Sequence, residues 1–287
     1  MELLLNEKEN IDNFNYLIKN IKNITENTII KFSSHSIHSQ GINSNKTCLY
    51  EFKIGNSWFN EYKYTTDETS IEIGINTVVL SKIFNTLSAN QSIKIIYNEI
   101  NCDYLTIEFC NLDKEDKTSF NKYFQLPLMD LNYSTMDTSN HNSDVSFEID
   151  CNKLCNICSQ TKAFHDTINI KCNENNIKFK INGIETKFTI KLDLDDVNEY
   201  SIVENLTFNQ MYDLNIFSTI SSFSKLSNVV ILELDSQNPM IVNYKITPEN
   251  EENEENEEFT LRFYLACKSN NDDEDDNSIY DNSSDDE

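Results

Sequence analysis

The sequence repeats one order of helix and strand patterns after about 140 residues. In the first half, an amphipathic helical pattern precedes a strand-like segment at residues 28–32 and a polar turn at residues 33–36. In the second half, a helical pattern from Cys151 precedes a strand-like segment at residues 167–172, and a polar turn at residues 173–176 follows it. Such self-similarity predicts two copies of one structural unit in tandem.

The later part of each unit recurs as well. Residues 76–87 form a helical pattern that precedes a hairpin pattern at residues 92–109, and residues 206–220 and 228–246 repeat this order. Between the helical patterns, short segments are rich in Ile, Phe, Tyr and Thr at alternating positions, which is typical of strands. The two units are therefore predicted to have the same mixed composition of two helices and many short strands.

A polar stretch separates the two units. Residues 130–144 are rich in turn-forming residues and lack any periodicity, so we expect an exposed interdomain connecting loop there. The chain is then an α+β protein with an N-terminal domain over residues 1–129 and a C-terminal domain over residues 145–269. Residues 270–287 are predicted to be an acidic disordered tail.

The net charge of −25 is concentrated in two segments. Residues 248–258 and 271–287 together hold 16 of the 48 acidic residues and contain no Lys or Arg. Both are expected to be solvated segments, one a loop and one a tail. The rest of the chain carries 32 acidic and 23 basic residues, a net charge of −9, so a local basic surface is compatible with the composition.

The sequence predicts an intracellular protein that is neither secreted nor inserted in a membrane. It contains no apolar run of about 18 residues, the length that a membrane span needs. Its opening residues, MELLLNEKEN, have too short an apolar run and no basic segment before it, which argues against a signal peptide. Eight cysteines without such a signal predict reduced thiols.

Cys151, Cys155 and Cys158 form a C-x3-C-x2-C array that permits two interpretations. The spacing resembles the cluster motif of radical-SAM enzymes, although four glycines do not supply the glycine-rich cofactor contacts of that family. For a structural zinc ion, the nearest fourth ligand is Cys172 in the following strand. On a helix, however, the three cysteines and Leu154 fall on one core-facing side, where cysteine packs as a small apolar residue. We favour packing, and a metal or cluster enzyme is the competing hypothesis.

No other catalytic constellation is present in the sequence. The phosphate-binding, dinucleotide-binding and nucleophile-elbow motifs are all absent. His35 and His38 lack the i, i+4 spacing of a helical zinc pair, and the histidines lie in turns or in the connecting loop. The run from Asp193 to Asp196 is explained by a strand that ends in an exposed loop. We therefore expect a protein that is not an enzyme and needs no cofactor or metal.

Five stretches together resemble the proliferating cell nuclear antigen family of sliding clamps, and the resemblance runs from about Ile11 to Lys268. They are similar to a helix of the first domain, the entry to the connecting loop, a helix of the second domain and the two C-terminal strands of that family. In chain order they read LSKIFNTL, LPLMDLN, LTFNQMYDLNIF, NPMIVNYKI and LRFYLACK. No single stretch is decisive, but the ordered set at this spacing is specific.

The resemblance implies a DNA-clamp fold in a homotrimeric ring, with helices around the hole and sheets outside. Such a ring encircles double-stranded DNA, acts as a DNA polymerase processivity factor and recruits replication and repair proteins through peptide motifs. It also implies a clamp loader as a partner. The location would be the nucleus or, if the source is a large DNA virus, the intracellular site of viral DNA replication.

The resemblance also assigns residues to three surfaces. The subunit interface would involve edge strands near Ser119–Leu126 and Glu185–Leu192, with Phe124, Phe164 and Phe188. The DNA-binding positions would be Lys19, Lys22, Lys46, Lys82 and Lys153. The partner-peptide pocket would be formed by Ile42, Leu49, Met136, Pro239, Tyr264, Leu265 and Ala266.

Several positions depart from the family pattern. Neutral residues replace basic ones on the expected lining helices at Asn15, Asn85, Asn156 and Ser159, and the fourth helix, expected around Met211–Thr219, carries no basic residue. Cys267 stands where the family has a C-terminal Pro. The thinner basic lining keeps an alternative open, in which the chain is a clamp-fold scaffold that acts as a monomer or as a hetero-ring member without loading on DNA.

Overall fold

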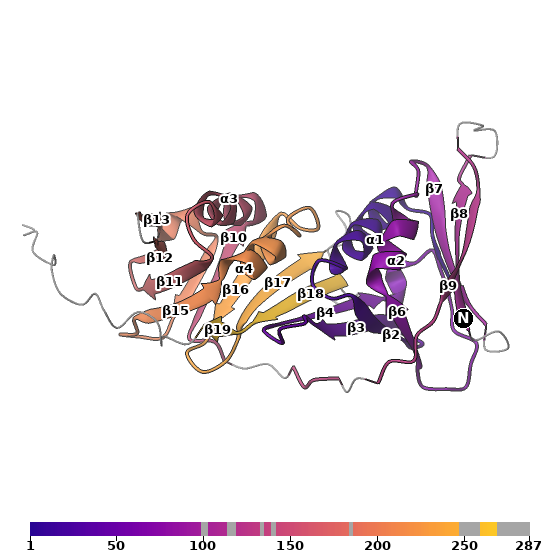
Figure 1. Cartoon of the computed structure of the whole chain (residues 1–287), viewed down its shortest axis with the longest axis horizontal. Helices are drawn as coiled ribbons and strands as arrows, with labels where there is room; N and C mark the ends of the chain where they lie inside the picture. The colour runs from indigo at the N-terminus through magenta and orange to yellow at the C-terminus, as the bar shows by residue number, and fades with distance from the viewer. Residues whose placement is uncertain are drawn as a thin grey trace, which may run out of the picture.

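The computed structural model describes residues 1–98, 103–113, 119–132, 135–138, 142–183, 186–246 and 259–268 (Figure 1). The predicted acidic tail, the glutamate-rich segment at residues 248–258 and Glu185 lie outside the described residues. Among the described residues, no helix has both the length and the apolar composition needed to cross a membrane.

The described strands form three antiparallel sheets. The N-terminal sheet contains, in spatial order, β5 (Glu61–Lys63), β1 (Glu2–Leu5), β7 (Gln91–Tyr97), β8 (Tyr104–Asn111) and β9 (Lys122–Pro127). The C-terminal sheet contains β13 (Lys187–Asp193), β12 (Asn176–Asn182), β11 (Thr167–Asn173), β15 (Phe208–Asp213) and β19 (Cys267–Lys268). The central sheet contains β14 (Glu199–Ile202), β10 (Val145–Asp150), β16 (Val229–Leu234), β17 (Met240–Ile246), β18 (Phe259–Leu265), β4 (Cys48–Gly55), β3 (Ser36–Ile42), β2 (Asn27–Phe32) and β6 (Ile71–Asn76).

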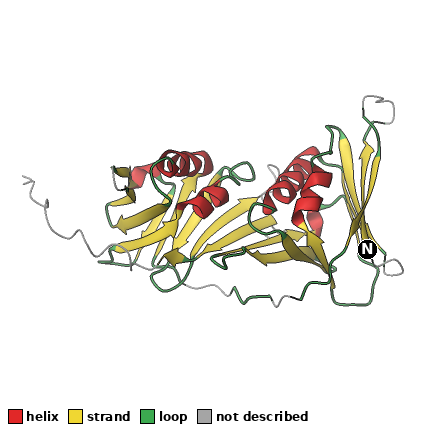
Figure 2. Ribbon diagram, in the orientation of Figure 1, coloured by secondary structure: helices red, strands yellow, loops and turns green. Residues whose placement is uncertain are grey.

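The α-helices lie together on one side of the central sheet (Figures 1 and 2). They are α1 (Lys8–Ile21), α2 (Thr77–Phe84), α3 (Cys151–Lys162) and α4 (Leu214–Ser221), with short 3-10 turns at Asn56–Trp58 and Leu194–Asp196. Asn76, Asp150 and Asp213 cap α2, α3 and α4, since each side chain accepts a backbone hydrogen bond from the first turn of its helix. The predicted α+β class with two similar units is confirmed.

The two units share the central sheet. β18, from the second unit, pairs with β4 of the first through six residue pairs, from Thr260–Lys53 to Leu265–Cys48. On the helical side, the Tyr16 hydroxyl of α1 donates a hydrogen bond to the Ser222 carbonyl (2.5 Å), and its ring packs edge-on against Phe223. The apolar core therefore continues across the junction between the units.

The fourth helix is shorter than the sequence predicted. The prediction treated residues 206–220 as one helix, but Phe208–Asp213 forms strand β15 and the helix begins at Leu214. β15 pairs with β11 and β19, which satisfies its backbone groups, and Phe208 and Tyr212 are buried in the core. A period-2 pattern was therefore mistaken for the first turns of a helix.

The connecting loop begins at a backbone contact with the edge of the central sheet. Met129 pairs with Gly74 of β6, and the Met129 N–H donates to the Gly74 carbonyl (2.9 Å). A Cβ atom at position 74 would lie 2.3 Å from the Met129 carbonyl oxygen, so only glycine permits this approach. The described residues of the loop lie on the side of the central sheet opposite the helices (Figure 1).

We expect Leu261→Ala to lower the free energy of unfolding by about 2–5 kcal/mol, because Leu261 is fully buried in β18 at the junction. Since the sheet is continuous, the fluorescence of Trp58 and the far-UV circular dichroism should show one coincident transition in urea. Thr260→Ala, on the outward side of the same strand, is the control and should change the midpoint little. Separate transitions for the two signals would contradict this view of the junction.

Candidate partner groove, helical face and subunit edges

A groove with a volume of about 350 Å³ lies on the outer face of the central sheet, opposite the helices. Among its lining residues are six of the seven that the sequence assigned to a partner pocket. These are Ile42, Leu49, Met136, Pro239, Tyr264 and Ala266. The structure therefore brings together residues that lie far apart in the chain.

Strand register explains why these side chains meet. Across neighbouring strands, Ile42 pairs with Leu49, Leu49 with Tyr264, and Tyr264 with Ile241. Paired residues point to the same face of a sheet, so these four side chains form one row across β3, β4, β18 and β17. Ile241 also lines the groove, and our sequence analysis missed it. The alternation of NPMIVNYKI signals it, because Met240 and Val242 point inward and Ile241 must then point outward.

Leu265 does not belong to this wall. Its side chain is fully buried, with Phe259, Leu261 and Phe263, on the side of β18 that faces the helices. Adjacent strand residues point to opposite faces, so Tyr264 and Leu265 cannot both line the groove. The assignment of Leu265 to the pocket is therefore corrected.

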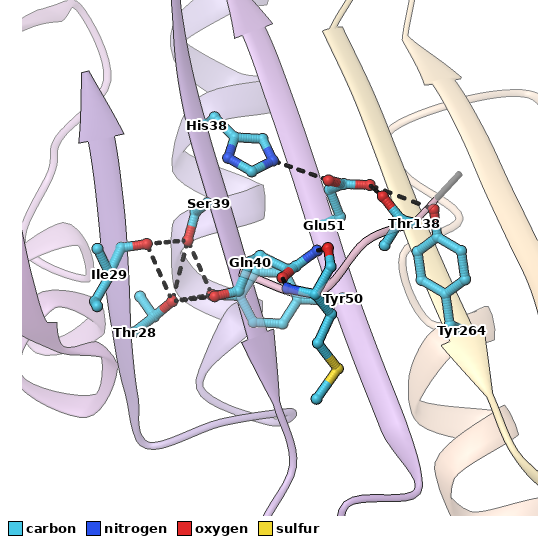
Figure 3. A network of polar contacts seen from close by, with 10 residues as sticks. Thr28, Ile29, His38, Ser39, Gln40, Tyr50, Glu51, Thr138 and Tyr264 are labelled. Carbon is cyan, nitrogen blue, oxygen red and sulfur yellow. Dashed lines mark hydrogen bonds and ion pairs between the residues drawn. The ribbon is translucent and has the colours of Figure 1, made fainter. Parts of the chain in front are cut away.

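Side chains of the sheet fix the connecting loop beside the groove (Figure 3). The Gln40 amide on β3 donates to the Met136 carbonyl (3.0 Å), and the Met136 N–H donates to Gln40 Oε1 (2.6 Å). The Gln40 side chain thus both donates to and accepts from the backbone of Met136, as a residue of a paired strand would. Met136 keeps half of its surface exposed (51%), so its side chain is accessible at the wall of the groove.

One carboxylate connects three segments near the groove (Figure 3). Glu51 Oε1 lies 2.9 Å from His38 Nε2 of β3, while Glu51 Oε2 accepts hydrogen bonds from the Thr138 hydroxyl (3.1 Å) and the Tyr264 hydroxyl (3.3 Å). Burial raises the pKa of Glu51, but the hydrogen bonds from His38, Thr138 and Tyr264 and the charge of His38 outweigh it, so the pKa lies below its usual value. Glu51 is therefore an anion at neutral pH.

Charged residues at the groove are mainly acidic. Glu233, Asp235 and Asp137 line it together with one basic residue, Lys46. The sequence placed Lys46 with the DNA-binding lysines, but it lies in the turn between β3 and β4, on the wall of the groove. Its assignment to DNA binding stays a prediction.

The other predicted DNA-binding lysines are on or beside the helices, and they differ in exposure and in whether they form an ion pair. Lys22, directly after α1, and Lys82 on α2 are exposed. Lys19 on α1 is half-buried, and its burial lowers the pKa of its ammonium group. Lys153 on α3 forms an ion pair with Asp196 (3.2 Å) and donates to the Asp196 carbonyl (2.7 Å). Lys153 is therefore partly neutralised within the chain.

Further basic residues also belong to the helical side. Lys162 is the exposed last residue of α3. Lys225 is exposed four residues beyond α4, and its ammonium group lies 5.7 Å from the centre of the Tyr16 ring. As expected from the sequence, α4 (Leu214–Ser221) carries no basic residue, but Lys225 lies shortly after its end. Lys225 follows the periodic segment in the sequence, so helical spacing could not assign it to the helical side.

Both segments predicted for subunit contacts contain edge strands. β9 ends the N-terminal sheet and β13 ends the C-terminal sheet, at opposite ends of the molecule (Figure 1). Phe124 of β9 is half-buried against Phe109, with 5.6 Å between ring centres. Phe188 of β13 packs on Phe164 (5.4 Å), which is 50% exposed. At the β9 edge, Phe120 and Tyr123 are more exposed still, at 78% and 64%, and the sequence analysis did not single them out.

Two cysteines of the C-x3-C-x2-C array belong to the core. Cys151 and Cys158 are buried with Leu154, as the helical spacing predicts, whereas Cys155 is half-buried. Burial raises the pKa of the Cys151 and Cys158 thiols to about 12, so they remain protonated at neutral pH. Among the described residues, no three His, Cys, Asp or Glu side chains are grouped as metal ligands.

The fold and these surfaces define the class of protein. Two similar α+β units share one sheet, with helices on one face and free strand edges at both ends, which is the architecture of a DNA sliding clamp. Residues 7–138 match the family model "Proliferating cell nuclear antigen, N-terminal domain", and residues 138–268 match "Proliferating cell nuclear antigen, C-terminal domain". The chain belongs to the proliferating cell nuclear antigen family, the processivity factors of DNA replication.

Curated relatives agree with this membership. Proteins described as "Proliferating cell nuclear antigen 1" from the K1/Thailand and 3D7 isolates of Plasmodium falciparum are each 25% identical to the chain over 264 residues. The match covers 89% of this chain and 93% of each relative. The similarity therefore extends over both units rather than over one of them.

We expect the buried thiols to resist alkylation in the native state. Iodoacetamide reacts with the thiolate, so exposed Cys267 should be modified before Cys48, Cys151, Cys158 and Cys172, whose pKa burial raises to about 12 and which should react only after unfolding. Mass spectrometry of peptides after timed labelling measures this order. A metal chelator should leave the urea midpoint unchanged, and a large decrease would support the metal-site hypothesis instead.

Proposed function

We propose that the chain closes into a homotrimeric ring around double-stranded DNA and tethers DNA polymerase and other replication or repair proteins. The observation that carries this proposal is the separation of three surfaces: helices on one face, the groove on the other, and unpaired edge strands at the two ends. In a ring of such subunits, the helices face the DNA and the groove faces outward. The chain would then act by binding rather than by catalysis.

Head-to-tail pairing of β9 with β13 is the proposed closure. Exposed edge strands with apolar neighbours favour pairing with another chain unless they are covered. Two different edges that pair head to tail form a closed ring when the rotation between subunits fits. Phe124 on one edge, with Phe164 and Phe188 at the other, would lie at this interface, together with the exposed Phe120 and Tyr123.

The proposed location is the nucleus or, for a viral chain, the intracellular site of viral DNA replication. Because three closed subunits cannot thread onto circular DNA, the ring would also need a clamp loader. The alternative is a clamp-fold scaffold that works as a monomer or in a hetero-ring, and the neutralised Lys153 and the neutral positions of α3 favour it.

We expect light scattering to give a mass near three times 33.4 kDa at micromolar concentration. Phe124→Asp should lower this mass toward that of one subunit, because it places a charge at the proposed interface. Glu72→Gln, at an exposed position of β6 away from the β9 and β13 edges, is the control. A wild-type chain that stays monomeric at all concentrations would favour the scaffold alternative.

We expect Lys22→Gln combined with Lys82→Gln to reduce polymerase stimulation and to flatten the salt dependence of DNA binding. Each lost phosphate contact should reduce the log–log salt slope by about 0.9. The matched control is Lys53→Gln with Lys245→Gln, which removes the same charge from exposed positions on the outer face. Equal losses in both variants would mean that only net charge matters and that the helical face is not the DNA track.

We expect a peptide of the form Gln-x-x-aliphatic-x-x-aromatic-aromatic to bind the groove at micromolar concentration, about −8 kcal/mol. Met136→Ala and Tyr264→Ala should each weaken binding by about 1 kcal/mol or more, since both side chains line the groove. Isothermal titration calorimetry on the assembled protein measures the effect. If both variants bind as tightly as the wild type, the groove is not the peptide site.

A further inference from the structure

The connecting loop beside the groove is held by the backbone of β6 and by side chains of β3 and β4. Its first contact is the backbone pair between Met129 and Gly74. At residues 135–138, the loop forms no strand; Met136 exchanges two hydrogen bonds with the Gln40 side chain, and the Thr138 hydroxyl donates to Glu51. The position of this wall of the groove is therefore set by side chains of β3 and β4.

Unlike Gln40, Glu51 contacts two sides of the groove, the connecting loop and strand β18. Its Oε2 atom accepts from Thr138 in the loop and from Tyr264 on β18, while Oε1 is held by His38. We propose that Glu51 is a positioning residue of the groove, which fixes the Tyr264 ring and the loop at Thr138 in the arrangement that receives a peptide. This inference rests on the proposed function of the groove as a peptide site.

The chemistry of the carboxylate suits this task. An ionised acceptor forms shorter and stronger hydrogen bonds than a neutral one, and one carboxylate has enough lone pairs for all three partners. Glu51 itself does not line the groove and is mostly shielded, with 18% of its side chain exposed. It therefore acts through Tyr264 and Thr138 and not by contact with the ligand.

The consequence for binding is preorganisation. A loop that is ordered only when the peptide arrives loses conformational freedom at that moment, and this loss weakens binding. A loop and an aromatic ring that are already held in place avoid most of that loss. On this inference, removal of the Glu51 carboxylate should weaken peptide binding although no contact to the peptide is deleted.

The test combines peptide binding with amide exchange. An alanine-based peptide with Gln, Leu and two Phe at the motif positions is titrated into wild type, Glu51→Ala, Glu51→Gln and the control Glu72→Gln. We expect Glu51→Ala to weaken binding about tenfold, Glu51→Gln to weaken it less because the amide oxygen still accepts a hydrogen bond, and Glu72→Gln to bind like wild type. Hydrogen exchange of the peptide-free protein should be faster at Met136–Thr138 in Glu51→Ala.

A double-mutant cycle separates positioning from general destabilisation. If Glu51 acts through the two hydroxyl groups, its loss should matter less in a Tyr264→Phe, Thr138→Ala background, whereas a general loss of stability would add independently. Additive effects, or wild-type affinity in Glu51→Ala, would overturn the inference. Should Glu51→Ala fail to fold, Glu51→Gln and the hydroxyl variants give the same cycle.

Failure of the proposed function has a different signature. If the wild-type ring binds no peptide, the groove is not a peptide site, yet exchange at Met136–Thr138 still reports whether Glu51 fixes the loop. Unchanged exchange in Glu51→Ala would then overturn the positioning role independently of any ligand.

Discussion

Antiparallel pairing between β4 and β18 is the constraint on which the rest of the structure depends. Its register places outward residues of one domain directly beside outward residues of the other, as with Leu49 and Tyr264. The inward residues of the same strands, such as Tyr50 and Phe263, continue the core beneath the helices. One set of backbone hydrogen bonds thus fixes the common side of the helices, the continuity of the groove and the distance between the free edges.

The sequence predicted the repeated units from local patterns, whereas most of the groove residues came from the resemblance to the family. Alternation along a strand and helical spacing are visible in one chain, and the ordered family stretches supplied the long-range placement. The error at Leu265 arose because a strand residue can point to either face of the sheet. Leu265 is apolar and adjacent to Tyr264, but only the strand's alternation shows that it points inward.

The charge distribution also required the three-dimensional structure. Counting lysines on predicted helices treats them as equivalent, but Asp196 neutralises Lys153 across 43 residues of sequence, and burial of Lys19 disfavours its charged form. Lys225 belongs to the helical side although it follows the helix. Likewise, the contacts of Glu51 join residues from three distant segments, and no spacing rule connects His38, Thr138 and Tyr264.

The row of outward side chains crosses the junction between the domains, with Ile42 and Leu49 on one side and Tyr264 and Ile241 on the other. A ligand bound along this row would contact both domains and restrain the angle between them. Binding and bending are then linked reciprocally: a ligand that prefers one angle between the domains resists distortion, and a subunit forced to another angle holds that ligand more weakly. In the proposed ring, mechanical load on a subunit would therefore change its affinity for a ligand bound in the groove.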